Sequence, residues 1–355
     1  MGECKITLPL SRRKPALQVL TERMKRAGID KIVIVTGGHE IAVRECALKL
    51  DIKPVHNPVY RTGMFSSVLA GVKALPKDTE AFFLLPADIP LIKPQTYKAL
   101  IETYRNAPGQ PEIVYPTFMG KREHPPLIGR MMIERIRDWS GEGGLRGLLE
   151  QYDDRSAEIP TADRGTSLDM DTPDDYQILR EYFENEVYPD CDEALELMKI
   201  ARTPARVVEH AVCVAAHAMK ICAALSAKDI KLNQHLLRAA CLLHDIAKGE
   251  HDHERIGAKW LRERGYGRVA KVTATHKNLP QRDKIGEEEI LYLTDKLTDG
   301  THITTLEARM IKMEARYAPK TEARSAARLR IRQAARIQRK IEKIIGQPLH
   351  NLLIA

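Results

Sequence analysis

The chain has 355 residues, 43% of them hydrophobic and 29% charged, with a net charge of +8, so a globular protein of two domains is expected rather than a single core. No apolar run approaches the roughly 20 residues that a membrane-spanning helix needs, and the first residues lack a signal-peptide pattern, which argues against a membrane or secreted protein. The six cysteines are scattered without a CxxC pair, which favours free thiols in a reducing cytoplasm over disulfides or a zinc knuckle.

Residues 1–182 alternate between helical and strand patterns. Apolar residues recur at helical spacing in four segments, 15–27, 41–50, 66–74 and 94–105. Short runs of strand-forming residues occupy four others, 31–36, 54–57, 81–85 and 112–116. This order predicts an α/β domain of three layers, in which helices cover both faces of a mostly parallel sheet.

Asp88 comes just after the predicted strand at residues 81–85 and lies between Pro86 and Pro90. In open α/β sheets, ligands bind beyond the carboxyl ends of the strands. A carboxylate held there can bind Mg²⁺, which bridges nucleotide phosphates. The alternative is that Asp88 only caps the helix that follows. We favour the metal, because the two prolines brace the carboxylate.

Asp169 and Asp171 alternate with apolar residues just before a predicted helix, with Thr172 as its cap and Pro173 at its first position. A spacing of two residues puts both carboxylates on one side of an extended segment. A second carboxylate near Asp88 would complete a Mg²⁺ site. The alternative is that these acids only stabilise the N-terminus of the helix.

Five motifs follow one another in this half of the chain. They are MGECKITLPL at 1–10, Asn57 with GMFSSV at 63–68, PADIP at 86–90, GKREHP at 120–125 and DMDTPDD at 169–175. In this order they resemble the motifs of the nucleotidyltransferases that attach a nucleotide to the molybdopterin cofactor, particularly the cytidylyltransferase branch. Because five ordered motifs agree, the resemblance is specific.

The resemblance implies roles for individual residues. Lys5, which alone would be typical of a solvated surface charge, would contact the triphosphate, and Asp88 with Asp169 or Asp171 would hold Mg²⁺. The nucleotide pocket would be lined by Asn57, Gly63, Met64, Ser66, Ser67 and His124. The implied reaction transfers a nucleotide from CTP or another NTP to a molybdopterin-type acceptor, with CTP versus GTP left open, and a molybdoenzyme or maturation factor is the implied protein partner. Such attack on an α-phosphate depends on charge neutralisation and in-line placement.

Members of this family carry a strand and a Gly-rich LAAGxSxR loop immediately before the MG of the first motif. That loop holds the phosphates with backbone N–H groups and an arginine. The sequence starts at the Met of this motif. We therefore expect that adding the strand and loop would increase stability and NTP binding, and that transferase activity depends on them.

Residues 183–203 are predicted to form a linker and a first helix, and strand signals vanish in residues 204–355. Seven helices are predicted there, at 204–225, 233–248, 253–265, 268–276, 287–297, 304–317 and 321–345. The second domain is therefore expected to be all-α.

The run at residues 242–249 begins with apolar residues and contains His244 and Asp245 side by side. Imidazole and carboxylate both bind divalent metals. Adjacent residues on a helix point about 100° apart, so a shared metal must lie near the helix end. The order of His210, His244, Asp245 and Asp295 resembles the four ligands of the HD superfamily of metal-dependent phosphohydrolases, and residues 241–249 resemble its HDIG variant.

The resemblance also covers a second metal, which some members hold at positions matching His253 and His276; one ion or two is left open. Two His and two Asp can hold an octahedral ion such as Mn²⁺, Fe²⁺ or Mg²⁺, and Zn²⁺ is a further candidate. The metal would activate water, and Lys248 would stabilise phosphate charge. The expected substrate is a phosphorylated small molecule or a nucleotide.

Three functions are compatible with these patterns. The leading one is a bifunctional nucleotidyltransferase and phosphohydrolase. The second is a nucleotide sensor that regulates the HD domain, and the third is a scaffold whose HD ligands are structural. Residues 299–355 hold 12 Lys and Arg against 5 Asp and Glu, but without interleaved aromatic residues, so a solvated helix face is favoured over nucleic-acid binding.

Overall fold

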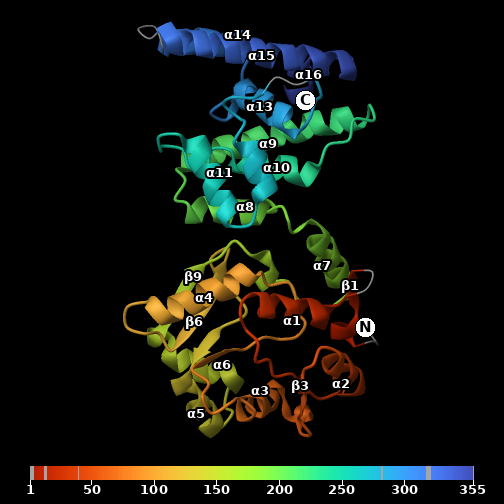
Figure 1. Cartoon of the computed structure of the whole chain (residues 1–355), viewed down its shortest axis with the longest axis vertical. Coiled ribbons are helices and arrows are strands. Elements are labelled where there is room, and N and C mark those ends of the chain that lie inside the picture. The colour runs from red at the N-terminus through yellow and green to blue at the C-terminus, as the bar shows by residue number, and fades with distance from the viewer. Residues whose placement is uncertain (1–3, 12–13, 39, 281–282, 317–320, 355) are drawn as a thin grey trace. The chain divides into compact units, whose positions relative to one another are not determined.

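A computed structural model of the chain describes residues 4–11, 14–38, 40–280, 283–316 and 321–354. Its contacts divide the chain into two compact units, Met1–Glu184 and Asn185–Ala355 (Figure 1). Residues 1–3 of the first motif and residue 317, the predicted end of a helix, lie outside the described residues. The predicted linker at 183–203 contains α8 (Cys191–Ile200), which packs on α10 (Gln234–Leu243) of the second unit.

The first unit alternates helices and strands as the sequence predicts. Its α-helices are α1 (Ala16–Arg26), α2 (Glu40–Lys49), α3 (Met64–Lys73), α4 (Pro94–Asn106), α5 (Arg130–Asp138), α6 (Gly144–Leu149) and α7 (Pro173–Asn185). Its strands are β1 (Pro9–Ser11), β2 (Lys14–Pro15), β3 (Val35–Thr36), β4 (Val55–His56), β5 (Ala81–Phe83), β6 (Ile113–Phe118), β7 (Lys121–Arg122), β8 (Leu127–Gly129) and β9 (Ser156–Pro160).

The strands of this unit pair in both directions: its five-stranded sheet is mixed, and β3 and β4 form a separate two-stranded sheet. The strands β5, β8, β6 and β7 are antiparallel neighbours, whereas β9 pairs with β6 in parallel and β3 pairs with β4 in parallel. A two-residue turn at Met119 and Gly120, both with positive φ, sends the chain back from β6 into β7 and makes them antiparallel. The chain reaches β9 through α5 and α6, and such long connections permit parallel pairing.

The helices of the first unit bury one face each. In α1, Leu17, Leu20 and Met24 are buried at intervals of three and four residues, as expected for an amphipathic helix. The helices α3 and α5 enclose a core against the sheet, formed mainly by Val68, Val72, Ile113, Ile128, Met132 and Ile136. This packing fixes the start of α3, which carries part of the predicted nucleotide pocket.

The second unit is helical, as predicted. After α8 and α10 its helices are α9 (Ala205–Ser226), α11 (His253–Glu263), α12 (Gly267–Thr273), α13 (Glu287–Leu297), α14 (Leu306–Arg316), α15 (Thr321–Ile345) and α16 (Leu349–Ile354). One small exception is a hairpin of β10 (Thr298–Asp299) and β11 (His302–Ile303), which the sequence does not predict. By length and composition α9 passes the test for a membrane span, but it packs against α10 and α13, as a core helix does.

Candidate metal centre and nucleotide site

The residues His244 and Asp245 lie immediately beyond the end of α10. Asn233 caps the start of this helix, because its Oδ1 accepts the backbone N–H of Leu236 at 2.9 Å. The last turn of α10 is buried in the core. The prediction that this helix continues to residue 248 is wrong, because a turn starts at residue 244 and Gly249 takes a φ of 116°. The turn lets two adjacent side chains reach one centre.

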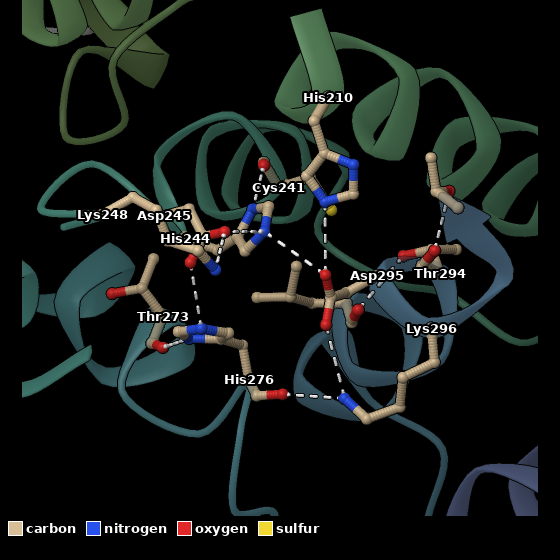
Figure 2. Close-up of polar contacts among 12 residues, drawn as sticks. His210, Cys241, His244, Asp245, Lys248, Thr273, His276, Thr294, Asp295 and Lys296 are labelled. Atoms are coloured by element: carbon tan, nitrogen blue, oxygen red, sulfur yellow. Dashed lines mark hydrogen bonds and ion pairs between the residues drawn. The ribbon is translucent and has the colours of Figure 1, made fainter. Parts of the chain in front are cut away.

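Six predicted ligands gather in two groups of three, and in each group the ligand atoms lie within 4.8 Å of one another. The first group is His210, His244 and Asp295, which Figure 2 labels. The second group is Asp245, His253 and His276. Asp245 lies between the groups: its Oδ2 is 3.5 Å from Nε2 of His244, and its Oδ1 is 3.2 Å from Nε2 of His253. The chain thus brings together ligands from α9, α11, α13 and the segments after α10 and α12.

All four imidazoles direct Nε2 toward the centre, and three of them place Nδ1 within hydrogen-bonding distance of a backbone carbonyl oxygen. For His244 and His276, Nδ1 is 2.8 and 2.7 Å from the carbonyl oxygen three residues earlier, and for His210 it is 2.9 Å from that of Gly300. For His253, Nδ1 is 3.4 Å from the carboxylate of the next residue. Because an acceptor holds the Nδ1 proton, a neutral imidazole keeps its Nε2 lone pair for a metal.

Three of the ligand atoms are buried without a hydrogen-bond partner among the described residues, namely His244 Nε2, Asp245 Oδ1 and His253 Nε2. An unsatisfied buried polar atom costs roughly 1–3 kcal/mol. Here the unsatisfied atoms face a common centre, and nitrogen with carboxylate oxygen is a donor set of divalent transition metals. The residues therefore fit a divalent ion in each group.

The carboxyl groups of the centre have shifted pKa values. Burial raises the pKa of the Asp245 carboxyl, but its interactions with His244, His253, His276 and Lys248 outweigh burial, and the net pKa is lowered. Burial also raises the pKa of Asp295, but Lys296 and the imidazoles hold it well below its usual range. Burial lowers the pKa of His244, but these carboxylates raise it by more, so the net pKa is raised. Both carboxyl groups are therefore ionised and available to a cation.

Lys248 places its ammonium beside this centre. Its Nζ lies 2.7 Å from Oδ2 of Asp245, and its side chain is 46% exposed (Figure 2). His210, His253 and Asp295 are partly exposed, whereas the other ligands are nearly enclosed. A ligand from solvent can therefore approach over these three residues and Lys248.

Two charged residues at this centre were not predicted. The carboxylate of Glu254 lies 3.4 Å from Nδ1 of His253 and 3.1 Å from Nζ of Lys277. Lys296 contacts Asp295 from within the core. Each directly follows a predicted ligand in the chain, so scanning the neighbours of ligands for charged residues would have found them.

The first unit contains a cavity of about 2170 Å³. Six predicted residues line it, namely Lys5, Gly63, Met64, Ser67, Asp88 and His124. Among the described residues, Asn57, Ser66, Asp169 and Asp171 are not in its wall. The cavity also meets the glycine-rich segment 141–144, in which Gly141, Gly143 and Gly144 have positive φ. The sequence GEGG at residues 141–144 could have predicted this glycine-rich segment.

Lys5 lies among the predicted metal-binding carboxylates. Its Nζ is 2.7 Å from Oδ1 of Asp171, and this hydrogen bond, aided by the charges of Asp88 and Asp169, raises the pKa of Lys5. The pKa of Asp169 is raised by partial burial and by the neighbouring carboxylates. Because like charges converge here, a divalent cation would relieve their repulsion.

Asn57 is buried and connects the loop before α3 to the first turn of that helix. Its Nδ2 donates to Oγ of Ser66 at 2.8 Å and to Oγ of Ser67 at 3.0 Å, and its Oδ1 accepts the N–H of Val59 at 3.1 Å. The side chain of Asn57 is thus occupied by the protein itself. Its contact with a ligand would pass through Ser67, which lines the cavity.

His124 faces the same cavity from the loop before β8. Burial lowers the pKa of its imidazole, against an opposing effect of Asp88, and its Nδ1 is buried without a partner among the described residues. A neutral imidazole with an unpaired nitrogen can exchange a hydrogen bond with a ligand.

Comparisons with known proteins give matches to both units. Residues 1–156 match the family described as "MobA-like NTP transferase domain", and residues 207–300 match the family described as "HD domain". The "Molybdenum cofactor cytidylyltransferase" of Escherichia coli (strain K12) is 30% identical over 187 residues, which cover 52% of this chain and 90% of that protein.

Similar solved structures cover about half of the chain. The crystal structure of Rv0371c from Mycobacterium tuberculosis H37Rv has a TM-score of 0.43 and 25% identity, over 51% of this chain and 91% of that one. A nucleotidyl transferase from Methanothermobacter thermautotroptrophicus has a TM-score of 0.43 and 20% identity, over 51% of this chain and 86% of that one.

Proposed function

The chain belongs to the MobA-like NTP transferase family through its first unit and carries an HD domain in its second, and on this basis we propose a bifunctional function for it. The first unit transfers a nucleotide from CTP or a related NTP to a molybdopterin-type acceptor. The second unit hydrolyses a phosphoester of a small molecule or nucleotide. The acceptor is proposed from the name of the Escherichia coli relative, together with the five sequence motifs.

The observation that carries the hydrolase proposal is the pair of ligand groups with orphaned buried atoms. His210, His244 and Asp295 would hold one divalent ion, such as Mn²⁺, Fe²⁺, Mg²⁺ or Zn²⁺. A second ion would be held by Asp245, His253 and His276. When bound, these ions supply the positive charge that neutralises phosphoryl oxygens. They also lower the pKa of water, so that it loses a proton more readily and becomes a better nucleophile.

The residues of the chain admit the phosphate, stabilise its charge and orient the ligands. The exposed side of the centre admits a phosphate over His210, His253 and Asp295. Lys248 then turns its ammonium from Asp245 to a phosphoryl oxygen, where it stabilises the negative charge that develops during attack. The carbonyl acceptors at Nδ1 keep His210, His244 and His276 in their orientation throughout.

In the first unit, the observation that supports the transferase is the convergence of Lys5, Asp88, Asp169 and Asp171 beside a large cavity. We propose that the carboxylates hold Mg²⁺ and that Lys5 exchanges Asp171 for the triphosphate. Ser67, Met64 and Gly63 would contact the nucleotide, with Asn57 and Ser66 holding the loop. His124 would complete the pocket.

The hydrolase is tested by metal analysis and a phosphoesterase screen with Mn²⁺. The wild-type chain is compared with His244→Ala, Asp245→Ala and a control, His251→Ala, whose side chain is exposed in the same loop. We expect bound metal and hydrolysis in the wild type and control, and loss of both in the two ligand variants. A wild-type chain without metal or hydrolysis would favour a scaffold.

The transferase is tested by titrating CTP and GTP with Mg²⁺, and by measuring pyrophosphate release with molybdopterin present. Asp88→Ala is expected to abolish Mg²⁺-dependent binding. Nucleotide binding without transfer would instead favour a sensor. We further propose a cytoplasmic location, in keeping with six free cysteines, and a molybdoenzyme or maturation factor as protein partner.

A further inference from the structure

Lys296 on α13 is the one lysine that is buried among the residues that the structure describes. Its Nζ donates to the carbonyl oxygen of His276 at 3.0 Å and lies 3.4 Å from Oδ2 of Asp295 (Figure 2). The same ammonium lies 3.6 Å from the ring centroid of Tyr292, whose hydroxyl donates to the carbonyl oxygen of Arg330 at 3.0 Å. The position of Lys296 is therefore fixed from three sides.

The two contacts of this ammonium reach different ligand groups. Asp295 belongs to the first group and His276 to the second. Lys296 contacts Oδ2 of Asp295. The other oxygen, Oδ1, lies 3.3 Å from Nε2 of His210 and 3.6 Å from Nε2 of His244. On His276, it holds the backbone of the residue whose imidazole faces Asp245. One side chain thus fixes a ligand in each group.

Packing alone does not account for a lysine at this place. A buried charge carries a large desolvation penalty, and an apolar side chain of similar length would avoid it. The side chain of Lys296 is only 8% exposed, so its ammonium bears this penalty. A charge kept at such a cost points to a role in the centre that it touches.

We propose that Lys296 is a positioning residue that couples the two ligand groups. It directs Oδ1 of Asp295 into the first group and holds the His276 segment in register with it, so that both groups are formed together. This inference rests on the proposed metal-dependent hydrolase.

A simple counter-charge would behave in the opposite way. An ammonium that only neutralises Asp295 competes with a metal for that carboxylate, so its removal would raise metal affinity. Loss of a positioning contact lowers metal affinity, roughly tenfold to a hundredfold for outer contacts of this kind. The sign of the change therefore separates the two roles.

The experiment titrates Mn²⁺ into the metal-stripped full chain and compares the wild type with Lys296→Met and Lys296→Gln. The control is Lys220→Met, because Lys220 also donates to a carbonyl oxygen, that of Leu353 at 2.9 Å, away from the centre. We expect two binding events in the wild type and control. In Lys296→Met both should weaken, by roughly tenfold or more, while Lys296→Gln, which keeps a donor, recovers part of the affinity.

Unchanged or raised Mn²⁺ affinity in Lys296→Met would overturn the positioning role while leaving the hydrolase proposal intact. A wild-type chain that binds no Mn²⁺ would overturn both. If Lys296→Met does not fold, Lys296→Gln decides by the same criterion, with its unfolding temperature in the metal-free state as the check on folding.

Discussion

The carboxylate of Asp245 is shared between two kinds of partner: its Oδ2 lies 2.7 Å from Nζ of Lys248, while its Oδ1 lies 3.2 Å from Nε2 of His253. Both oxygens face predicted metal ligands, because Oδ2 also lies 3.5 Å from Nε2 of His244, and Oδ2 in addition faces the half-exposed ammonium of Lys248. Since Lys248 is the partner that reaches solvent, it can leave Asp245 for a phosphate without disturbing the ligand set.

The first prediction concerns Lys248→Met. We expect kcat for phosphoester hydrolysis to fall by roughly 10²–10³-fold, as for the loss of one group that stabilises developing charge. Metal content should stay as in the wild type, because Lys248 is not a ligand. The control is Lys259→Met, an exposed lysine on α11 that pairs with Glu263. Loss of metal together with activity would assign Lys248 to the stability of the metal site instead.

The second prediction concerns Glu254, the carboxylate behind His253. Burial raises its pKa, but hydrogen bonds from its own backbone N–H and from Lys277 outweigh burial, so the pKa is lowered and the group is ionised at neutral pH. An ionised carboxylate 3.4 Å from Nδ1 attracts the Nδ1 proton and increases the basicity of the imidazole. In Glu254→Gln we therefore expect Mn²⁺ affinity to fall by roughly tenfold to a hundredfold.

This prediction is checked by Mn²⁺ titration with Glu263→Gln, an exposed glutamate on the same helix, as the control. Only one of the two binding events should weaken, because Glu254 touches the second ligand group alone. Equal weakening of both events, or of neither, would contradict the assignment.

Much of the helical unit is predictable from the sequence, because its signals are local. The predicted helices at 287–297 and 321–345 have the observed bounds of α13 and α15. In α13, a run of glutamates after Gly286 marks the start of the helix, and Glu289 accepts the N–H of Gly286 at 2.9 Å. The candidate metal ligands were predicted because their order along the chain resembles a known family.

The parts that were not predicted depend on partners far along the chain. The predicted strand at 31–36 is reduced to β3, which is defined by its pairing with β4 alone, and β8 and β9 were not expected. The contact of Lys296 with a backbone carbonyl and the Nδ1 acceptors of three imidazoles likewise have no sequence pattern, because any residue supplies a carbonyl.

The third prediction concerns pH and the pair of Lys14 and Glu22, which fastens β2 to α1. Partial burial raises the pKa of Glu22, but hydrogen bonds from Lys14 and Gln18 lower it more, so the folded pKa lies below the ordinary value of 4.5. The stabilisation is therefore present above about pH 4.5 and is lost as the pH falls through the folded pKa. Because both side chains are substantially exposed, it amounts to at most about 1 kcal/mol.

Glu22→Gln should thus lower the free energy of unfolding of the first unit at neutral pH and match the wild type in acid. Urea unfolding followed by Trp139 fluorescence measures it. A Trp260→Phe background removes the only other tryptophan, which lies in the second unit. A difference that persists or grows in acid would show that Glu22 acts through packing rather than charge.

The last prediction separates support from ligand contact at the nucleotide cavity. Ser67 lines the cavity and Ser66 does not, yet both accept hydrogen bonds from the buried Asn57. Ser67→Ala should therefore weaken CTP binding in Mg²⁺ more than Ser66→Ala does. Asn57→Ala should weaken binding and also cost roughly 1–3 kcal/mol of stability, because buried polar groups lose their partner.

Calorimetric CTP titration and thermal unfolding of the three variants distinguish the roles. If Asn57→Ala lowers stability but binds CTP as the wild type does, Asn57 supports only the loop, and the role implied for it in the pocket is wrong. Equal loss of affinity in both serine variants would mean that the nucleotide reaches beyond the cavity wall to Ser66. A loss confined to Ser67→Ala and Asn57→Ala would place the ligand contact on Ser67, with Asn57 acting through it.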